Sequence, residues 1–284
     1  MGDQQSTNRS GTATFDVDRL TNLARTLRRE VLEMTTAAGS GHPSSSFSAV
    51  EILSALYFGG ILQYDSKNPH WPERDRFILS KGHAAPILYA VLAEAGYFPK
   101  SELNTLRKLG SPLEGHPNMR RLAGVEASTG SLGQGLSIGL GHALAARSAS
   151  RRYNVYVMMG DGEIEEGQVW EAAMAAANLK AGNFIAIVDN NGYQQTTAVS
   201  HLTDPSLYAE KWRAFGWKTV EINGHDLNEA HQALARATEY EDGPFAIVAH
   251  TVKGKGLKFM ETDFTWHGRA VPKKQLQEAL EEIG

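Results

Sequence analysis

Hydrophobic positions recur at helical spacing from Asp16 onward. In this first segment the apolar residues return every three or four positions, which indicates an amphipathic helix with one apolar stripe. Gly39, Ser40 and Gly41 follow directly and are expected to end that helix. The stripe consists of Leu20, Leu23, Leu27, Val31, Met34 and Ala38.

The rest of the chain alternates between short apolar runs and helical patterns. The runs predict strands at 77–80, 153–159, 184–189, 217–222 and 245–251. The patterns predict helices at 47–58, 83–95, 101–109, from the Gly-rich segment 130–135 to 149, at 165–179, 206–215 and 226–239, and from 272 onward. This alternation favours an α/β fold with a mostly parallel central sheet covered by helices on both faces. We expect a disordered polar tail over residues 1–15 and a single domain over residues 16–284.

Composition narrows the functional classes. With 284 residues, 42% of them hydrophobic, the chain can bury a substantial core. The 28 basic and 32 acidic residues nearly balance, so neither a nucleic-acid surface nor a polybasic membrane patch is expected. The sequence has no cysteine, which excludes disulfides, thiolate metal sites and a cysteine nucleophile. Neither a signal peptide nor an apolar stretch of about 18 residues is present, so we expect a cytoplasmic protein without a membrane partner.

Two polar residues follow apolar runs at the spacing of a crossover unit. Asp161 comes just after the run 155–159, and Asn191 just after the run 184–188. They are about 30 residues apart, the length of one strand–helix–strand unit, so both should lie at the same edge of the sheet. A carboxylate, a side-chain amide and a nearby carbonyl are hard oxygen ligands. They suit an octahedral Mg²⁺ that keeps diphosphate oxygens and water as its other ligands.

The segment resembles the thiamine diphosphate motif of the transketolase family, Gly-Asp-Gly followed some thirty residues later by Asn-Asn. Residues 74–83, 129–135, 211–217 and 253–256 also match that family, and the likeness extends over nearly the whole chain from residue 16. The resemblance implies a thiamine diphosphate-binding fold. It further implies that Asp161, Asn191 and the carbonyl of Tyr193 hold Mg²⁺ on the cofactor's diphosphate, with Ca²⁺ or Mn²⁺ as substitutes.

Four histidines lie in loops that contain glycine or proline: His42, His83, His116 and His267. Small neighbours allow a ligand to approach closely, and histidine can donate, accept or move a proton near neutral pH. Each one alone is explained as well by a loop histidine bonded to the backbone. Together, in this order, they resemble the transketolase histidines that surround the cofactor's reactive carbon. The resemblance therefore implies catalytic roles for all four, with contacts to donor-sugar hydroxyls and to the diphosphate.

The resemblance also implies a wider set of cofactor-binding positions. These are His83, Gly130, Leu132, Gly160, Asp161, Gly162, Glu166, Asn191 and His267. The order G-x-x-G-x-G in residues 130–135 differs from a dinucleotide-binding loop, and the sequence has no Walker A loop.

Three further positions lie near the expected site: Glu166, Glu171 and Ser44. Glu166 and Glu171 either stabilise the positive end of a helix or, by the resemblance, pass protons between paired active sites. Ser44 stands where relatives have glycine, so we expect an added hydroxyl near the donor site.

The resemblance is to the N-terminal half of transketolase. In that family a glutamate from a second, pyrimidine-binding domain activates the cofactor, and no counterpart is found in residues 1–284. We therefore expect the N-terminal subunit of a split transketolase, paired with a C-terminal pyrimidine-domain subunit as an α2β2 assembly and acting on a sugar or sugar phosphate. One alternative is a thiamine diphosphate enzyme that passes a two-carbon unit to a lipoyl or carrier-protein thiol. The other is a non-enzymatic scaffold or regulatory subunit.

Overall fold

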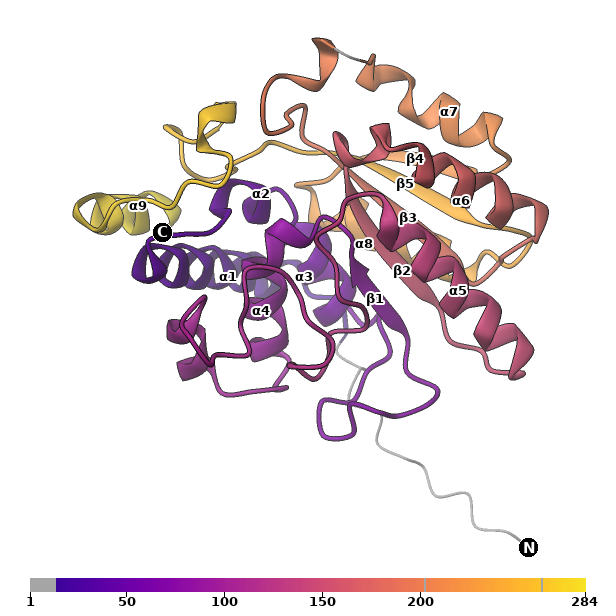
Figure 1. Ribbon diagram of the computed structural model, residues 1–284, viewed down its shortest axis with the longest axis horizontal. Coiled ribbons are helices and arrows are strands. Elements are labelled where there is room, and N and C mark those ends of the chain that lie inside the picture. Colours follow the sequence, from indigo (N-terminus) through magenta and orange to yellow (C-terminus); the bar gives the residue numbers. More distant parts are fainter. Residues whose placement is uncertain (1–13, 202, 262) are drawn as a thin grey trace, which may run out of the picture.

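A five-stranded parallel sheet forms the centre of this computed structural model, which describes residues 14–201, 203–261 and 263–284. The strand order is β1-β2-β3-β5-β4 (Figure 1). The strands are β1 (Arg76–Leu79), β2 (Val155–Gly160), β3 (Phe184–Asn190), β4 (Lys218–Asn223) and β5 (Phe245–His250). Every neighbouring pair is parallel, so the predicted α/β class is confirmed. The tail expected over residues 1–15 lies, up to residue 13, outside the described residues.

Helices cover both faces of the sheet (Figure 1). Side chains alternate along each strand: in β2, Tyr156 and Met158 join one hydrophobic cluster, while Val157 and Met159 join the other. The first cluster contains α1 (Val17–Ala38), α3 (Val50–Phe58), α4 (Ala85–Glu94), α8 (Leu227–Glu239) and α9 (Leu276–Ile283). The second contains α5 (Gln134–Ser148), α6 (Gly167–Asn178) and α7 (Tyr208–Ala214).

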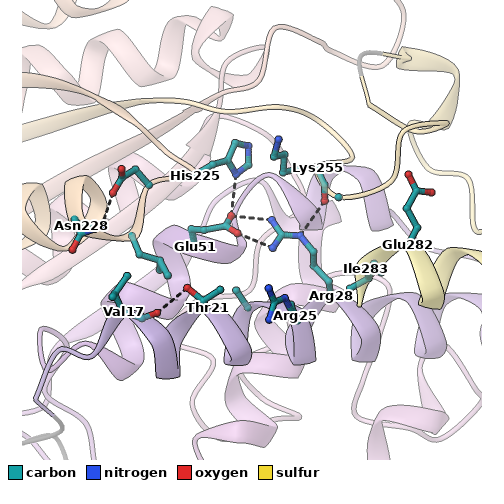
Figure 2. Close-up of a pocket in the computed structure, with 14 residues that line it drawn as sticks. Val17, Thr21, Arg25, Arg28, Glu51, His225, Asn228, Lys255, Glu282 and Ile283 are labelled. Carbon is teal, nitrogen blue, oxygen red and sulfur yellow. Dashed lines mark hydrogen bonds and ion pairs between the residues drawn. The ribbon is translucent and has the colours of Figure 1, made fainter.

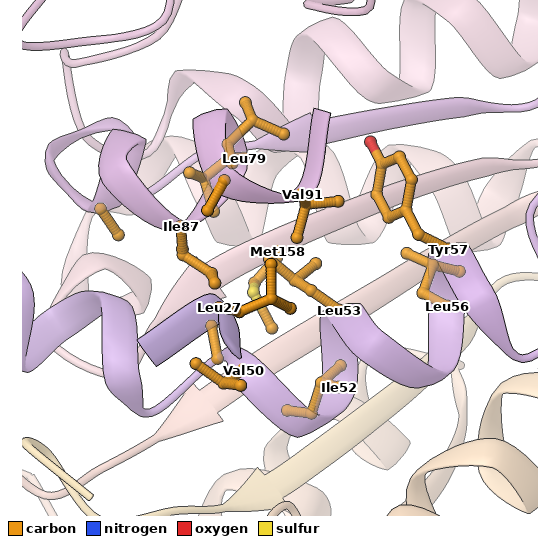
Figure 3. Close-up of a cluster of buried hydrophobic side chains, with 14 of the residues drawn as sticks. Leu27, Val50, Ile52, Leu53, Leu56, Tyr57, Leu79, Ile87, Val91 and Met158 are labelled. Carbon is orange, nitrogen blue, oxygen red and sulfur yellow. The ribbon is translucent and has the colours of Figure 1, made fainter. Parts of the chain in front are cut away.

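The long helix α1 is fixed at both ends and along its apolar stripe. Asp16 caps its start by accepting a hydrogen bond from the backbone N–H of Arg19 at 3.0 Å, and Gly39 ends it with a left-handed φ of 63°. The apolar stripe faces inward, where Leu27 packs among α3, α4 and the sheet residue Met158 (Figure 3). None of the described helices is both long and apolar enough to cross a membrane.

Several predicted helices differ from the observed elements. The helix expected over 47–58 is observed as α3, which begins three residues later, at Val50. A turn at Ser48 and Ala49 separates it from the short helix α2 (Pro43–Phe47). The short helix expected over 101–109 is a 3-10 helix over Lys100–Thr105, and it ends four residues earlier than predicted because Arg107 has a positive φ of 57°. The regions 83–95, 206–215 and 272 onward each begin with a 3-10 turn before the α-helix.

Candidate functional site

One cavity of about 540 Å³ lies at the carboxyl ends of the four adjacent strands β1, β2, β3 and β5. It is called the edge cavity below. Asp161 follows β2 and Asn191 follows β3, and the strand register pairs Gly160 with Asp189. The prediction that Asp161 and Asn191 share one edge is therefore confirmed. All the predicted site residues line the edge cavity: His42, His83, His116, Gly130, Leu132, Gly160, Asp161, Gly162, Glu166, Asn191, Tyr193 and His267.

The predicted metal ligands are held by backbone hydrogen bonds. Asp161 is buried and accepts from the N–H groups of Gly162 at 2.9 Å and Gly192 at 2.5 Å. Burial, with the nearby Asp189, raises the pKa of Asp161 to about 7. Asn191 Oδ1 accepts from the N–H of Tyr193 at 3.2 Å. A divalent cation against Asp161 would favour the ionised carboxylate, because an opposite charge stabilises the charged form.

These donors fit a diphosphate-bound metal. Within the described residues no group of three or more histidine or acidic side chains could hold a metal ion. The carbonyl of Tyr193 already accepts from the ammonium of Lys253 at 3.2 Å, so it faces a positive charge. A Cβ atom built on Gly160 would meet only Lys81 Cδ at 3.9 Å, which leaves room for a ligand above this strand end.

Three of the four histidines form a triangle across the edge cavity. The ring centroids of His42, His83 and His267 lie 5.0 to 5.3 Å apart. Burial is the main cause that lowers the pKa of all three, to about 4 for His42 and about 3 for His267. Nearby positive charge adds to it: Arg107 and Lys253 at His42, and Lys81 and Lys253 at His83 and His267. The rings are therefore neutral at pH 7, and each can offer one donor and one acceptor nitrogen.

The fourth histidine lies beside Gly130. His116 is exposed, and a Cβ built on Gly130 would come within 2.9 Å of its ring. Gly130 has a φ of 144°, a conformation that other residues rarely adopt.

Two polar atoms of residues that line the edge cavity, His42 Nδ1 and Ser45 Oγ, have no hydrogen-bond partner among the described residues. Polar atoms of this kind are suited to meeting a ligand, since buried groups without a partner are costly.

The structure adds residues that the sequence reasoning did not single out. Lys81 and Asp189 form a fully buried ion pair at the floor of the edge cavity, which Lys81 lines. The buried Glu163 accepts from the N–H groups of Gly133 at 3.0 Å and Gly160 at 3.1 Å, and so joins the Gly-rich segment to the Gly-Asp-Gly turn. The signal was their position at strand ends: Lys81 lies two residues after β1, and Asp189 is the second-last residue of β3. Each lies two residues from a position that had been singled out, His83 and Asn191.

Two expectations about individual residues change. The Ser44 hydroxyl does not line the cavity; it donates to the carbonyl of Trp266 at 3.0 Å and so holds the segment that carries His267. Glu166 precedes α6 without making a capping hydrogen bond, and it faces the edge cavity. Glu171 is exposed and lies outside the cavity lining. The proton-relay role of this pair stays a prediction.

Comparison with known proteins matches this geometry. A sequence model of the family described as "Transketolase, thiamine diphosphate binding domain" matches residues 19–284. Human transketolase is 43% identical over 93% of this chain, but the match covers 42% of its own length. The 6-deoxy-6-sulfo-D-fructose transketolase subunit SqwG of Clostridium sp. (strain MSTE9) is 40% identical over 93% of this chain and 96% of its own.

Solved structures agree with the sequence comparison. The crystal structure of transketolase from Campylobacter jejuni subsp. jejuni NCTC 11168 superposes with a TM-score of 0.89 at 33% identity, over 95% of this chain and 43% of that one. A Pichia stipitis transketolase complex with sedoheptulose 7-phosphate gives 0.83 at 27% identity, over 93% and 44%. The chain thus spans about two fifths of the length of most of these relatives. It belongs to the transketolase family, of which it carries the thiamine diphosphate-binding domain.

Proposed function

We propose that this chain is the cofactor-binding subunit of a two-chain transketolase. The enzyme would transfer a two-carbon ketol unit from a ketose or ketose phosphate to an aldehyde acceptor. The observation that carries the proposal is the edge cavity, where the oxygen donors of Asp161, Asn191 and Tyr193 share one space with the histidine triangle.

The residues divide into a diphosphate end and a reacting end. Asp161, Asn191 and the Tyr193 carbonyl would hold Mg²⁺, with Ca²⁺ or Mn²⁺ as substitutes, and the ammonium of Lys253 would meet the diphosphate charge. When bound, the cofactor supplies a nucleophilic carbon and an electron sink for carbon–carbon cleavage. His42, His83, His116 and His267 would bind substrate hydroxyls and hold or move protons at their ring nitrogens.

The two-chain arrangement is supported by the SqwG comparison. That relative is described as a subunit, and the match covers 96% of its length. We infer a partner subunit that carries the pyrimidine-binding domain and its activating glutamate, in an α2β2 assembly. The cytoplasmic location expected from the sequence stays a prediction.

Reconstitution tests this proposal. The chain, mixed with a pyrimidine-domain subunit, thiamine diphosphate and Mg²⁺, is expected to transfer a ketol unit from a ketose phosphate to an aldose phosphate, and EDTA should abolish turnover. The chain alone should give less than about 1% of that rate, because the activating glutamate of the partner subunit is missing. Equal turnover without the partner would refute the two-chain arrangement. Turnover only with a lipoyl or carrier-protein thiol as acceptor would favour the other enzyme class.

Gly130 offers a second test of the site. Alanine at this position would strain a backbone with a φ of 144° and force the His116 ring to move, since the new Cβ would lie 2.9 Å from it. We expect Gly130→Ala to weaken thiamine diphosphate binding by about tenfold, roughly 1.4 kcal/mol. Isothermal titration calorimetry on the reconstituted complex measures this. The control Gly141→Ala, in α5 with no atom within 4 Å of the new Cβ, should leave binding unchanged.

A further inference from the structure

A buried ion pair lies on the side of loop 252–256 away from the edge cavity. Arg28 on α1 donates to both carboxylate oxygens of Glu51 on α3, at 2.7 and 2.9 Å (Figure 2). Both residues are less than a tenth exposed. Burial alone would raise the pKa of Glu51, but Arg28 and His225 lower it to about 2. The carboxylate is therefore ionised across the physiological range and binds two partners with fixed directions.

The second partner of Glu51 is His225, which follows the end of β4. Its Nδ1 atom lies 2.9 Å from Glu51 Oε2, and its Nε2 atom accepts the backbone N–H of Val252 at 2.8 Å (Figure 2 shows the first of these contacts). Because Nε2 accepts, the ring proton of the neutral histidine belongs on Nδ1, where it is donated to Glu51. The carboxylate thus sets both the tautomer and the orientation of the ring that holds Val252.

Arg28 holds the same loop at a second point. Its Nε atom donates to the carbonyl of Lys255 at 3.0 Å. The two contacts lie on either side of Lys253, one at Val252 and one at Lys255. Between them the Lys253 side chain extends in the other direction, into the edge cavity, where its ammonium lies 3.2 Å from the Tyr193 carbonyl and 2.8 Å from His267 Nδ1.

We propose that Arg28, Glu51 and His225 form a positioning unit that fixes the backbone around Lys253, so that its ammonium meets the cofactor's diphosphate. The three side chains do not line the edge cavity and act only through the loop. This inference rests on the proposed function, because the position of Lys253 matters only if a diphosphate binds there. Simple packing does not account for the unit, since apolar side chains of similar volume hold two helices together at least as well as buried charges do.

Two substitutions at His225 separate its two hydrogen bonds. The amide oxygen of Gln lies close to where Nε2 was, so His225→Gln keeps the acceptor for Val252. The amide nitrogen of Asn lies close to where Nδ1 was, so His225→Asn keeps the donor to Glu51 and loses the bond to the loop. In the reconstituted complex we expect His225→Asn to weaken thiamine diphosphate binding by about tenfold, as expected when a group that orients a ligand is lost. His225→Gln should change it by less than about threefold.

Hydrogen exchange of the peptide covering 251–257 gives a readout that needs no cofactor. His225→Asn should accelerate exchange in this peptide, and His225→Gln should not. Unchanged exchange in His225→Asn would overturn the positioning role. Accelerated exchange with unchanged cofactor affinity would overturn it as well, because loop order would then not matter to the site. A wild-type complex that binds no thiamine diphosphate would instead overturn the proposed function, while the exchange data would still report on the loop.

A double-mutant cycle with Lys253→Met tests whether the unit acts through Lys253. If it does, His225→Asn should weaken cofactor binding about tenfold in the wild-type background and less than about twofold in the Lys253→Met background. Equal effects in both backgrounds would overturn the route through Lys253.

Discussion

Asp161→Asn is expected to lower the affinity of the reconstituted complex for thiamine diphosphate and Mg²⁺ by about 100-fold or more, and turnover with it. Removing a group that only orients a metal ligand costs about 10- to 100-fold in affinity or activity, and loss of the ligand's own charge should cost at least as much. Asparagine preserves the shape of the side chain but removes the carboxylate that would face the cation. Calorimetric titration of thiamine diphosphate at saturating Mg²⁺ measures the loss.

The same substitution should not unfold the chain. Burial, with the nearby Asp189, already disfavours the ionised form of Asp161 and raises its pKa to about 7. Replacing it with a neutral amide therefore removes an unfavourable buried charge while sacrificing one of two backbone hydrogen bonds. We expect the free energy of unfolding, measured in urea without cofactor, to change by less than about 1 kcal/mol.

An exposed aspartate provides a matched control. Asp204 also accepts a backbone N–H, that of Ser206 at 2.9 Å, but it lies on the surface. Asp204→Asn should leave cofactor affinity unchanged. If Asp161→Asn bound thiamine diphosphate and Mg²⁺ as tightly as the wild type, Asp161 would not be a metal ligand.

The strand ends could be predicted from the sequence because apolar runs mark where buried parallel strands stop. Asp161 and Asn191 follow such runs directly, so their meeting at one edge required only the rule that parallel strands end on the same side. The bounds of β2 and β3 shifted by at most two residues. The local pattern of apolar runs was therefore sufficient to predict the strands and to place Asp161 and Asn191, the predicted metal ligands, at one edge of the sheet.

Residues whose role depends on distant contacts could not be predicted in the same way. Lys81 reads as a polar loop residue, yet it is fully buried and paired with Asp189. Because Asp189 lies 108 positions away in the sequence, no local pattern reveals this pair. The sequence does not show that Ser46 and Ser48 are buried, with hydroxyls that donate to the Ala84 carbonyl and to Asp189. Hydrophobicity alone does not reveal a buried hydroxyl whose acceptor comes from another part of the chain.

Lys81→Met is expected to lower the free energy of unfolding by about 3 to 5 kcal/mol, the range for removal of one partner from a buried ion pair. Lys81 Nζ donates to Asp189 and to the carbonyl of Ser45 at 2.8 Å, and both side chains of the ion pair are at most 1% exposed. Methionine fills the space of the aliphatic stem but leaves the Asp189 carboxylate without a cation. Urea unfolding followed by far-UV circular dichroism measures the change.

Lys100→Met is the matched control, because this lysine also pairs with two carboxylates, those of Glu30 and Glu94, but is 52% exposed. Exposed pairs contribute little, so its loss should cost less than about 1 kcal/mol. Adding Asp189→Asn to Lys81→Met removes the unpaired charge and should recover about 1 to 2 kcal/mol. If Lys81→Met cost no more than Lys100→Met, the ion pair at the floor of the edge cavity would contribute nothing to stability. Its retention would then have to be explained by the position that it gives to the strand ends below Asp161 and Asn191.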